Sequence, residues 1–413
     1  MNYVKTAVCV KCGAEHDATP NLTTCRKCGG ILDICYDYDR IRSSLSKSSL
    51  KERDDFSMWR YREFLPVDDA QLAKGSSPSG LRVGWSPLYK ADRLAGQLGL
   101  SALYIKDDGI NPTASLKAPA SAMAVAKAKE AGAKIIACSS TGNAASSLAG
   151  NAAAAGFETV IFVPERAPKG KVTQLMVFGA HVISVKGTYE DTFRLSAEAI
   201  EEYGWYNRNA AINPYLMEGK KTVSFEIAEQ LDFHMTDYVA VSVGDGCTIS
   251  GVWKGFTDLY QAGLIDRLPR LISVQAEGCC PINRAIAEGK DWYPMEENTI
   301  ADSIAVGVPR NPDKALNAIR ESNGVVVNVS DAEILQAMRI LGRTCGVFAE
   351  PAGATGTAGV KKALEEGLIP SNASVVSIVT GSGLKDVANA MKAAGEPVSI
   401  EPSMEKLREV LTL

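Results

Sequence analysis

The stretch Lys106-Asp-Asp-Gly-Ile-Asn-Pro-Thr-Ala-Ser-Leu-Lys117 places a lone lysine at the end of a polar turn. The run Ala118-Pro-Ala-Ser-Ala-Met-Ala-Val-Ala126 follows at once and predicts a helix of small residues that begins near Lys117. A lysine in such surroundings is partly desolvated, which lowers its pKa and leaves a neutral amine that can form a Schiff base with a carbonyl. Taken alone, the stretch is more typical of a solvated surface lysine.

Three further segments each lead from an apolar run into a polar turn and a helix start. Ser139-Ser-Thr-Gly-Asn-Ala-Ala145 has the form of a helix N-terminus that binds an anion such as a carboxylate. Gly244-Asp-Gly-Cys-Thr-Ile-Ser-Gly251 is a glycine-rich turn whose main-chain donors can hold a phosphate. Thr380-Gly-Ser-Gly-Leu-Lys-Asp386 brings a hydroxyl into a glycine turn. Each turn alone is a common connection in α/β proteins.

The order of the four motifs resembles that of the fold-type II pyridoxal phosphate enzymes, and among them most closely the threonine synthases. The resemblance covers roughly residues 80–390 and includes Pro214-Tyr-Leu-Met-Glu-Gly-Lys-Lys-Thr222 and Glu350-Pro-Ala-Gly353. It implies a two-domain α/β fold like that of the tryptophan synthase β chain, with pyridoxal 5′-phosphate in the cleft between the two domains. Short Val- and Ile-rich runs between helical stretches independently favour a parallel sheet that is covered on both faces.

The resemblance also implies a role for each matching residue. Lys117 carries the cofactor and moves protons at Cα and Cβ of the substrate. Asn143 bonds the hydroxyl of the cofactor ring, and the hydroxyl of Thr380 meets the ring nitrogen, which favours elimination and replacement over transamination. The substrate carboxylate is bound by Ser140, Thr141 and Gly142. The cofactor phosphate is bound by Gly244, Asp245, Gly246, Cys247 and Thr248.

This chain departs from the threonine synthase pattern at three places. Ala118-Pro119 stands where relatives carry a charged Asp-Arg pair. Asp245 puts a carboxylate in the phosphate loop, which requires its side chain to point away or to accept a main-chain N–H. Ala210, Ala211 and Leu216 replace the Asn-Ser pair and the arginine that hold the substrate's phosphate in relatives. Four lysines are candidates to compensate: Lys169, Lys171, Lys220 and Lys221.

The expected activity is that of a lyase that converts O-phospho-L-homoserine and water to L-threonine and phosphate. The apolar residues in the phosphate-binding segment leave open a threonine or serine ammonia-lyase, or a β/γ-replacement enzyme for another amino acid. A catalytically idle relative that binds pyridoxal phosphate or an amino acid is a further alternative, which retention of Lys117, Asn143 and Thr380 disfavours.

Four of the ten cysteines form two Cys-x-x-Cys pairs, each followed by a glycine: Cys9, Cys12, Cys25 and Cys28. This spacing predicts a structural zinc ribbon with four thiolate ligands. The other cysteines are expected to be small buried residues in a reducing compartment. The three histidines His16, His181 and His234 lie beside no nucleophile and show no metal-ligand spacing.

Composition places the chain among soluble cytoplasmic enzymes that act on small molecules. It has 413 residues, 46% of them hydrophobic, and a net charge of −4 with interspersed signs. We therefore expect no nucleic-acid or membrane partner. We expect a zinc ribbon over residues 1–40, a linker and arm over 41–80, and a catalytic region over 81–413 whose smaller part spans about 100–215. The family resemblance adds the expectation of a homodimer.

Overall fold

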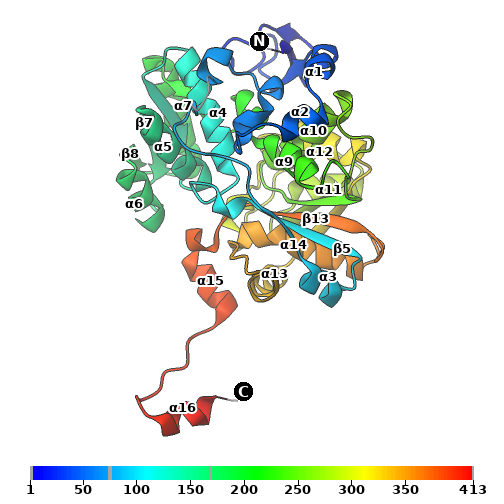
Figure 1. Cartoon of the computed structure of the whole chain (residues 1–413). Helices are drawn as coiled ribbons and strands as arrows, with labels where there is room; N and C mark the ends of the chain where they lie inside the picture. The colour runs from blue at the N-terminus through cyan, green and yellow to red at the C-terminus, as the bar shows by residue number, and fades with distance from the viewer. Residues whose placement is uncertain (1–2, 73–76, 168, 412–413) are drawn as a thin grey trace.

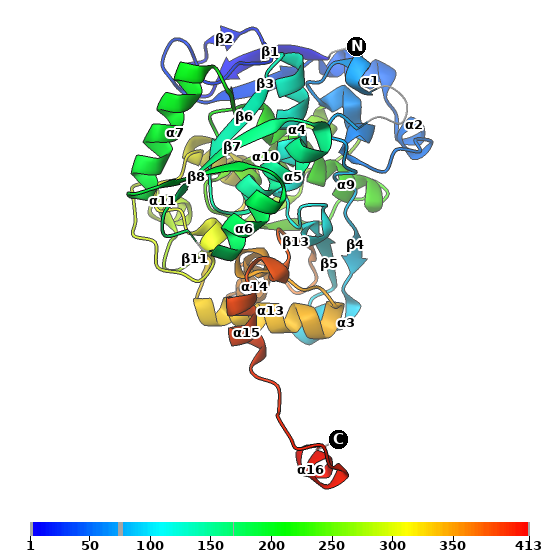
Figure 2. The same ribbon diagram turned by 90° about the vertical axis from the view of Figure 1, so that its left-hand side faces the viewer.

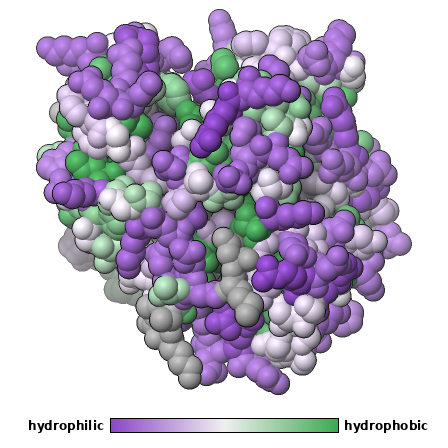
Figure 3. Space-filling view, turned by 90° about the horizontal axis from the view of Figure 1, so that it is seen from above, coloured by the Kyte–Doolittle hydropathy of each residue, from purple (hydrophilic) through white to green (hydrophobic). Residues whose placement is uncertain are grey.

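The computed structural model describes residues 3–72, 77–167 and 169–411 (Figure 1). Figures 1 and 2 show the N-terminal sheet at one end of the molecule and helices α13, α15 and α16 at the other. Seen from the N-terminal end, the surface is mainly polar, with small apolar areas scattered over it (Figure 3). Among the described residues, none of the helices combines the length and the apolar character needed to cross a bilayer.

The N-terminal ribbon is an antiparallel sheet of three strands in the order β2-β1-β3. Its strands are β1 (Val4–Cys9), β2 (Glu15–His16) and β3 (Leu32–Tyr36). Of the first cysteine pair, Cys9 ends β1 and Cys12 lies in the turn that follows, and the second pair lies before β3. Leu22, Leu32 and Ile34 are buried and join the core of the main body, so the ribbon is packed against the catalytic region.

An arm of short helices connects the ribbon to the main body. It contains α1 (Tyr38–Ser44), α2 (Lys47–Lys51) and the 3₁₀ segments Met58–Phe64 and Asp69–Leu72. Tyr61 and Phe64 are buried and pack on the ring of Phe225 in α9 (Thr222–Gln230). The guanidinium of Arg60 pairs with the carboxylate of Glu229 at 2.6 Å, also on α9. The aromatic arm therefore lies on the body through buried contacts.

The larger sheet has six strands in the order β12-β11-β10-β13-β5-β4, all parallel except β4, which runs antiparallel to β5. Its strands are β4 (Leu88–Lys90), β5 (Ala102–Asp107), β10 (Tyr238–Ser242), β11 (Arg270–Ala276), β12 (Val325–Val329) and β13 (Ser374–Val379). In β10, Val239 and Val241 face one core, whereas Tyr238 and Ala240 face the other. This period of two buries the strand on both faces.

Helices cover both faces of the larger sheet (Figure 1). One face carries α3 (Asp92–Leu98), α13 (Asp331–Cys345), α14 (Pro351–Glu365) and α15 (Val387–Ala394). The other carries α9, α10 (Cys247–Gln261), α11 (Pro281–Glu288) and α12 (Pro312–Glu321). After α15 the chain runs away from the body to α16 (Met404–Val410).

The smaller sheet has four parallel strands in the order β8-β7-β6-β9. These are β6 (Ile135–Ser139), β7 (Glu158–Pro164), β8 (His181–Val185) and β9 (Tyr206–Asn207). Around it lie α4 (Lys117–Glu130), α5 (Asn143–Ala155), α6 (Lys169–Val177), α7 (Tyr189–Tyr203) and α8 (Tyr215–Lys220). The predicted α/β fold with two parallel sheets is confirmed. β5 belongs to the larger sheet, although it lies at the start of the range expected for the smaller part.

Candidate active site

Lys117 is held at the start of α4 by a turn that is tied to the end of β13. The main-chain N–H of Leu116 donates to the carbonyl of Thr380 at 3.0 Å, and the N–H of Ser382 donates to the carbonyl of Ala114 at 3.1 Å. Ala114 takes a positive φ of 58° to make this turn. Two motifs that are far apart in the sequence are thereby joined through the backbone, and Lys117 and Thr380 line the same cavity.

This inner cavity collects most of the residues that the sequence singled out. It is lined by Lys117, Ala144, Arg208, Ala210, Lys220, Ser242, Gly244, Asp245, Gly246, Cys247, Thr248, Ser303, Ile304, Glu350 and Thr380. Thr141, Gly142 and Asn143 line an outer cleft, which also borders on Glu350. The hydroxyl of Ser140 instead accepts the N–H of Gly142 at 3.3 Å and shapes the turn.

Burial and neighbouring cations lower the pKa of Lys117 to about 8. The largest cause is desolvation, followed by the positive charge of Lys220, and Arg208 acts in the same direction. The carboxyl of Glu350 opposes them. A neutral amine is therefore accessible near neutral pH, as the small-residue context of Lys117 predicted.

The glycine loop between β10 and α10, which the sequence predicts to bind a phosphate, needs its glycines. A Cβ on Gly244 would come within 2.9 Å of Cα of Ile304. Gly246 has a φ of +85°, and a Cβ there would lie 2.5 Å from the carbonyl oxygen of Asn311. The first N–H groups of α10 have no partner within the helix and face a position suited to an anion.

Asp245 does not oppose an anion at this loop. Its carboxylate Oδ1 accepts the main-chain N–H of Arg310 at 3.1 Å, and its carbonyl accepts the N–H of Asn311 at 2.9 Å. The carboxylate is thus engaged with the segment that leads into α12. The carboxylate of Asp245 therefore accepts a main-chain N–H, which is one of the two arrangements that the sequence analysis required.

Glu350 is a site residue that the sequence reasoning did not single out, although its segment was part of the family resemblance. Its Oε1 accepts from the side-chain amide of Asn143 at 2.7 Å. Burial raises the pKa of Glu350 to about 7, against the opposing effects of Lys117 and Asn143. A Cβ on Gly381 would come within 2.3 Å of the same carboxylate oxygen. The Glu-Pro-Ala-Gly segment therefore contributes a carboxyl group between the inner cavity and the outer cleft.

The Ala118-Pro119 departure is explained by packing between α4 and α8. A Cβ on Gly219 would come within 2.3 Å of the carbonyl oxygen of Pro119 and 3.0 Å of Cα of Ala120. The two helices touch through their backbones, and Ala118 and Pro119 are themselves buried. A long charged side chain at either position would therefore have to be buried as well.

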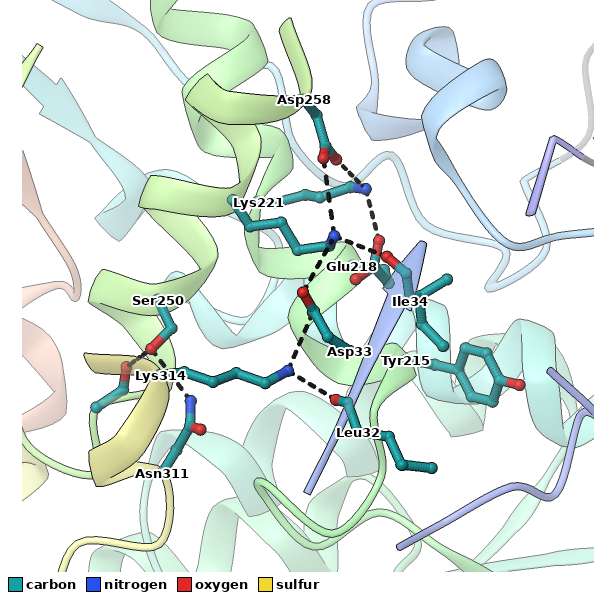
Figure 4. Close-up of polar contacts among 12 residues, drawn as sticks. Leu32, Asp33, Ile34, Tyr215, Glu218, Lys221, Ser250, Asp258, Asn311 and Lys314 are labelled. Carbon is teal, nitrogen blue, oxygen red and sulfur yellow. Dashed lines mark hydrogen bonds and ion pairs between the residues drawn. The ribbon is translucent and has the colours of Figure 1, made fainter. Parts of the chain in front are cut away.

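The four lysines that were candidates for phosphate binding differ in their surroundings. Lys221 is fully buried and pairs with Glu218 and Asp258, each at 2.5 Å (Figure 4). Lys171 is paired with Asp302 at the edge of the outer cleft. The side chain of Lys169 lies outside the described residues. Lys220 alone among the described three points to the inner cavity, where it is accompanied by Arg208, which the sequence reasoning missed.

The ribbon is bound to the body by a buried polar network. The Nζ of Lys254 donates to the carbonyl of Ile34 at 2.7 Å, and the Nζ of Lys314 donates to the carbonyl of Leu32 at 2.6 Å and to Asp33 at 3.1 Å (Figure 4). Lys314 lies one helical turn after Asn311, whose N–H bonds the phosphate loop. Strand β3 is therefore connected to that loop through Lys314 and Asn311.

The four ribbon cysteines converge on one point. Their sulfur atoms lie within 4.8 Å of one another, with Cys9 and Cys28 at 3.5 Å and Cys12 and Cys25 at 3.7 Å. Four thiolates about 2.3 Å from one tetrahedral ion would lie about 3.8 Å apart, so the cluster fits such an ion. The imidazole Nε2 of His16 lies 3.2 Å from the sulfur of Cys25, a contact that the spacing of the histidines did not reveal.

The inner cavity also fits pyridoxal phosphate. It contains the desolvated Lys117, a glycine loop at a helix start, the side chain of Thr380 and two further buried cations, Arg208 and Lys220. An aldehyde for Lys117 and a phosphate for the loop are the groups that this set of donors would bind.

Known proteins agree with this description. Residues 80–381 match the family model of the pyridoxal-phosphate dependent enzymes. The chain is 41% identical to the threonine synthase of Methanocaldococcus jannaschii and 40% identical to that of Methanosarcina acetivorans, in each case over 406 residues and 98% of both chains.

Solved structures with the same fold include two enzymes of other names. Threonine deaminase isoform 2 from Solanum lycopersicum has a TM-score of 0.65 at 24% identity, covering 75% of this chain and 88% of its own. Diaminopropionate ammonia lyase from Escherichia coli has a TM-score of 0.66 at 23% identity, covering 85% and 92%. At these identities the likeness concerns the fold alone. On the full-length similarity, the chain belongs to the pyridoxal-phosphate dependent enzymes and, within them, to the threonine synthase family of lyases.

Proposed function

We propose that the chain converts O-phospho-L-homoserine and water to L-threonine and phosphate. The observation that carries this proposal is the similarity over 98% of both chains to proteins named threonine synthase. The inner cavity supports it, because it offers a lysine for the cofactor and cations for phosphate groups in one place.

The residues of the cavity divide the binding work. The loop Gly244–Thr248 and the start of α10 would hold the cofactor's phosphate through main-chain N–H groups. The start of α5, with Thr141 and Gly142, would receive the substrate carboxylate. Asn143, the first residue of α5, is oriented by its bond to Glu350. The hydroxyl of Thr380 would meet the ring nitrogen of the cofactor.

Lys117 and Glu350 are the groups that accept and donate protons. The bound cofactor supplies an electron sink next to the substrate's Cα. The amine of Lys117 takes the proton from Cα, and a lysine with a pKa near 8 exchanges protons near neutral pH far more readily than one at 10.5. Glu350, with a pKa of about 7, holds a proton over part of the same pH range and keeps Asn143 in place.

The test is to mix the purified holoenzyme with O-phosphohomoserine and to measure both phosphate and threonine. Equal amounts of the two products are expected, and Lys117→Ala should yield neither. Serine and threonine are tested alongside as substrates. Keto-acid formation from either, without phosphate release from O-phosphohomoserine, would assign the chain to the ammonia-lyases instead.

We further propose that Cys9, Cys12, Cys25 and Cys28 bind one structural zinc ion. The sulfur distances support this, and so does the contact of His16 with Cys25, because a ring N–H can donate to a zinc-bound thiolate. Metal analysis of the purified protein should give one zinc per chain. A stoichiometry near zero after purification without chelators would overturn the assignment.

We also propose a division of the chain into the ribbon (1–40), the arm (41–80) and the catalytic region (81–413) with a smaller part at about 100–215. A homodimer is proposed as well. The C-terminal segment supports the dimer, since α16 stands apart from the body with Met404 and Val410 exposed (Figures 1 and 2). Light scattering should give twice the chain mass. None of the ten cysteines forms a disulfide, which supports a reducing, cytoplasmic location.

A further inference from the structure

Two buried cations in the inner cavity have no carboxylate partner. Arg208 is 2% exposed and Lys220 is 5% exposed, and both line the cavity beside Lys117. Within the described ranges, the guanidinium of Arg208 donates only to the hydroxyl of Ser121, at 3.1 and 3.3 Å. Neither cation forms an ion pair with any carboxylate in the part of the chain that the structure describes.

Other buried lysines of this protein are neutralised within the fold. Lys106 pairs with Glu226 at 2.7 Å, and Lys221 pairs with Glu218 and Asp258. Burying a cation without a partner costs several kcal/mol. Burial of Arg208 and Lys220 therefore carries a desolvation cost that an ion pair offsets at the other buried lysines. Such a cost is expected where an external anion supplies the missing negative charge.

Ser121 holds the positive charge of Arg208 beside Lys117. Ser121 follows Lys117 by four positions on α4, so the two side chains lie on the same face of the helix. Its hydroxyl fixes the guanidinium of Arg208 along that face. Lys220 approaches from the end of α8, where its Cβ is 3.2 Å from a Cβ built on Gly251 of α10. The two cations thus flank Lys117 from two different elements.

We propose that Arg208 and Lys220 together bind the phosphoryl group of the amino-acid substrate. This inference rests on the proposed function and names the residues that recognise its phosphorylated substrate. The cofactor's phosphate already has the glycine loop and the N-terminus of α10, whereas a second phosphate dianion in the same cavity needs further positive charge.

The same wall of the cavity explains how the apolar departures are accommodated. Ala210 lines the inner cavity, and Ala211, Leu216 and Lys220 line a small adjoining cavity that reaches the ribbon at Leu32. Leu216 itself is 2% exposed and packs into the core of the smaller sheet. The charge that relatives place at that position is supplied here from Arg208 and Lys220.

The test compares phosphorylated and unphosphorylated ligands. Wild-type holoenzyme, Arg208→Met and Lys220→Met are rapidly mixed with O-phosphohomoserine or with homoserine, and apparent dissociation constants are read from the first absorbance change of the bound cofactor, before turnover. Each variant should raise the dissociation constant for O-phosphohomoserine by roughly 10- to 100-fold and that for homoserine by less than about threefold. Lys361→Met, which removes a partly exposed lysine that pairs with Glu365 on α14, is the charge-matched control and should change neither constant.

A second titration separates the two phosphates. Cofactor-free protein is titrated with pyridoxal phosphate, and its dissociation constant should stay within about threefold of wild type in both variants. A loss of cofactor affinity equal to the loss for O-phosphohomoserine would overturn the proposal and assign the cations to the cofactor's phosphate. Unchanged affinity for every ligand would overturn it in favour of a purely structural role.

A milder variant guards against misfolding. Ser121→Ala keeps both charges but releases the guanidinium of Arg208, and it should weaken O-phosphohomoserine by roughly 3- to 10-fold with homoserine unaffected. Failure of the proposed reaction is recognised separately. If the wild type binds O-phosphohomoserine far more tightly than homoserine but forms no threonine, the reaction is wrong and the anion site stands.

Discussion

Replacing Lys117 by methionine should stabilise the cofactor-free protein while abolishing its chemistry. Burial and the nearby cations lower the pKa of this lysine from 10.5 to about 8, and each pKa unit corresponds to about 1.4 kcal/mol. At pH 7 the folded state therefore carries a penalty of about 3 kcal/mol for holding a charged lysine there, which methionine removes. Because the amine faces a cavity that opens to solvent, we expect a gain of about 2 to 3 kcal/mol.

The pH dependence gives this prediction its sign. Below pH 8 the amine is charged in both the folded and the unfolded state, so the full penalty applies. Between pH 8 and 10.5 the folded protein binds fewer protons than the unfolded chain, and the penalty shrinks as the pH rises. The advantage of Lys117→Met should thus fall by about 1 kcal/mol between pH 7 and pH 9 and vanish above 10.5.

Thermal unfolding of both cofactor-free proteins measures the effect. For a chain of 413 residues, the unfolding entropy is about 0.9 kcal/mol/K, so 2 to 3 kcal/mol corresponds to roughly 2 to 3 °C in Tm at pH 7. Lys361→Met, on the surface, should shift Tm by less than about 0.5 °C. A Lys117→Met protein that is no more stable than wild type at pH 7 would refute the inference that this lysine is desolvated.

Three further perturbations test other parts of the structure. Lys106→Met leaves the buried carboxylate of Glu226 unpaired and should cost about 3 to 5 kcal/mol in urea unfolding; full stability would mean that the ion pair is not formed. Cys25→Ser should lower the zinc content and the Tm with a smaller effect on cofactor absorbance, and unchanged metal stoichiometry would contradict the four-thiolate site. Asp33→Asn weakens the bond to Lys314 that links β3 to the phosphate loop, so the affinity for pyridoxal phosphate should fall by about two- to fivefold at constant zinc content; an unchanged affinity would show that the ribbon does not support the loop.

Much of the site was predictable because its signals are local. The glycines at 244 and 246 are required by contacts within one turn and its neighbours, and the small residues after Lys117 belong to one helix. The strands β6, β7, β10, β11 and β13 are runs rich in apolar residues, which is why the sequence favoured a parallel sheet covered on both faces. The edge strand β8 is largely exposed, and β9 has only two residues.

The residues that sequence reasoning missed act across elements. Glu350 was visible as part of a motif, but its bond to Asn143 joins two helix starts on different sheets. Arg208 stands in a polar stretch, Trp205-Tyr-Asn-Arg-Asn209, with no periodic or spacing signal of its own. Lys220 and Lys221 are adjacent in the sequence, and only their surroundings decide that one is neutralised by carboxylates and the other is open to the cavity.

The sequence alone determined the α/β class, and it indicated the lysine, the glycine loop and the cysteine cluster that we propose for the cofactor and the zinc ion, since each depends on residue types within a few positions of one another. Only the tertiary structure decided which charges remain unpaired in the cavity. Parallel strands bring their carboxyl ends and the following loops to one edge of a sheet, so residues from distant segments meet there. Arg208 and Lys220 are candidates for binding an external anion because both are buried and neither has a carboxylate partner among the described residues. This combination depends on contacts between distant segments, so no single segment of the sequence shows it.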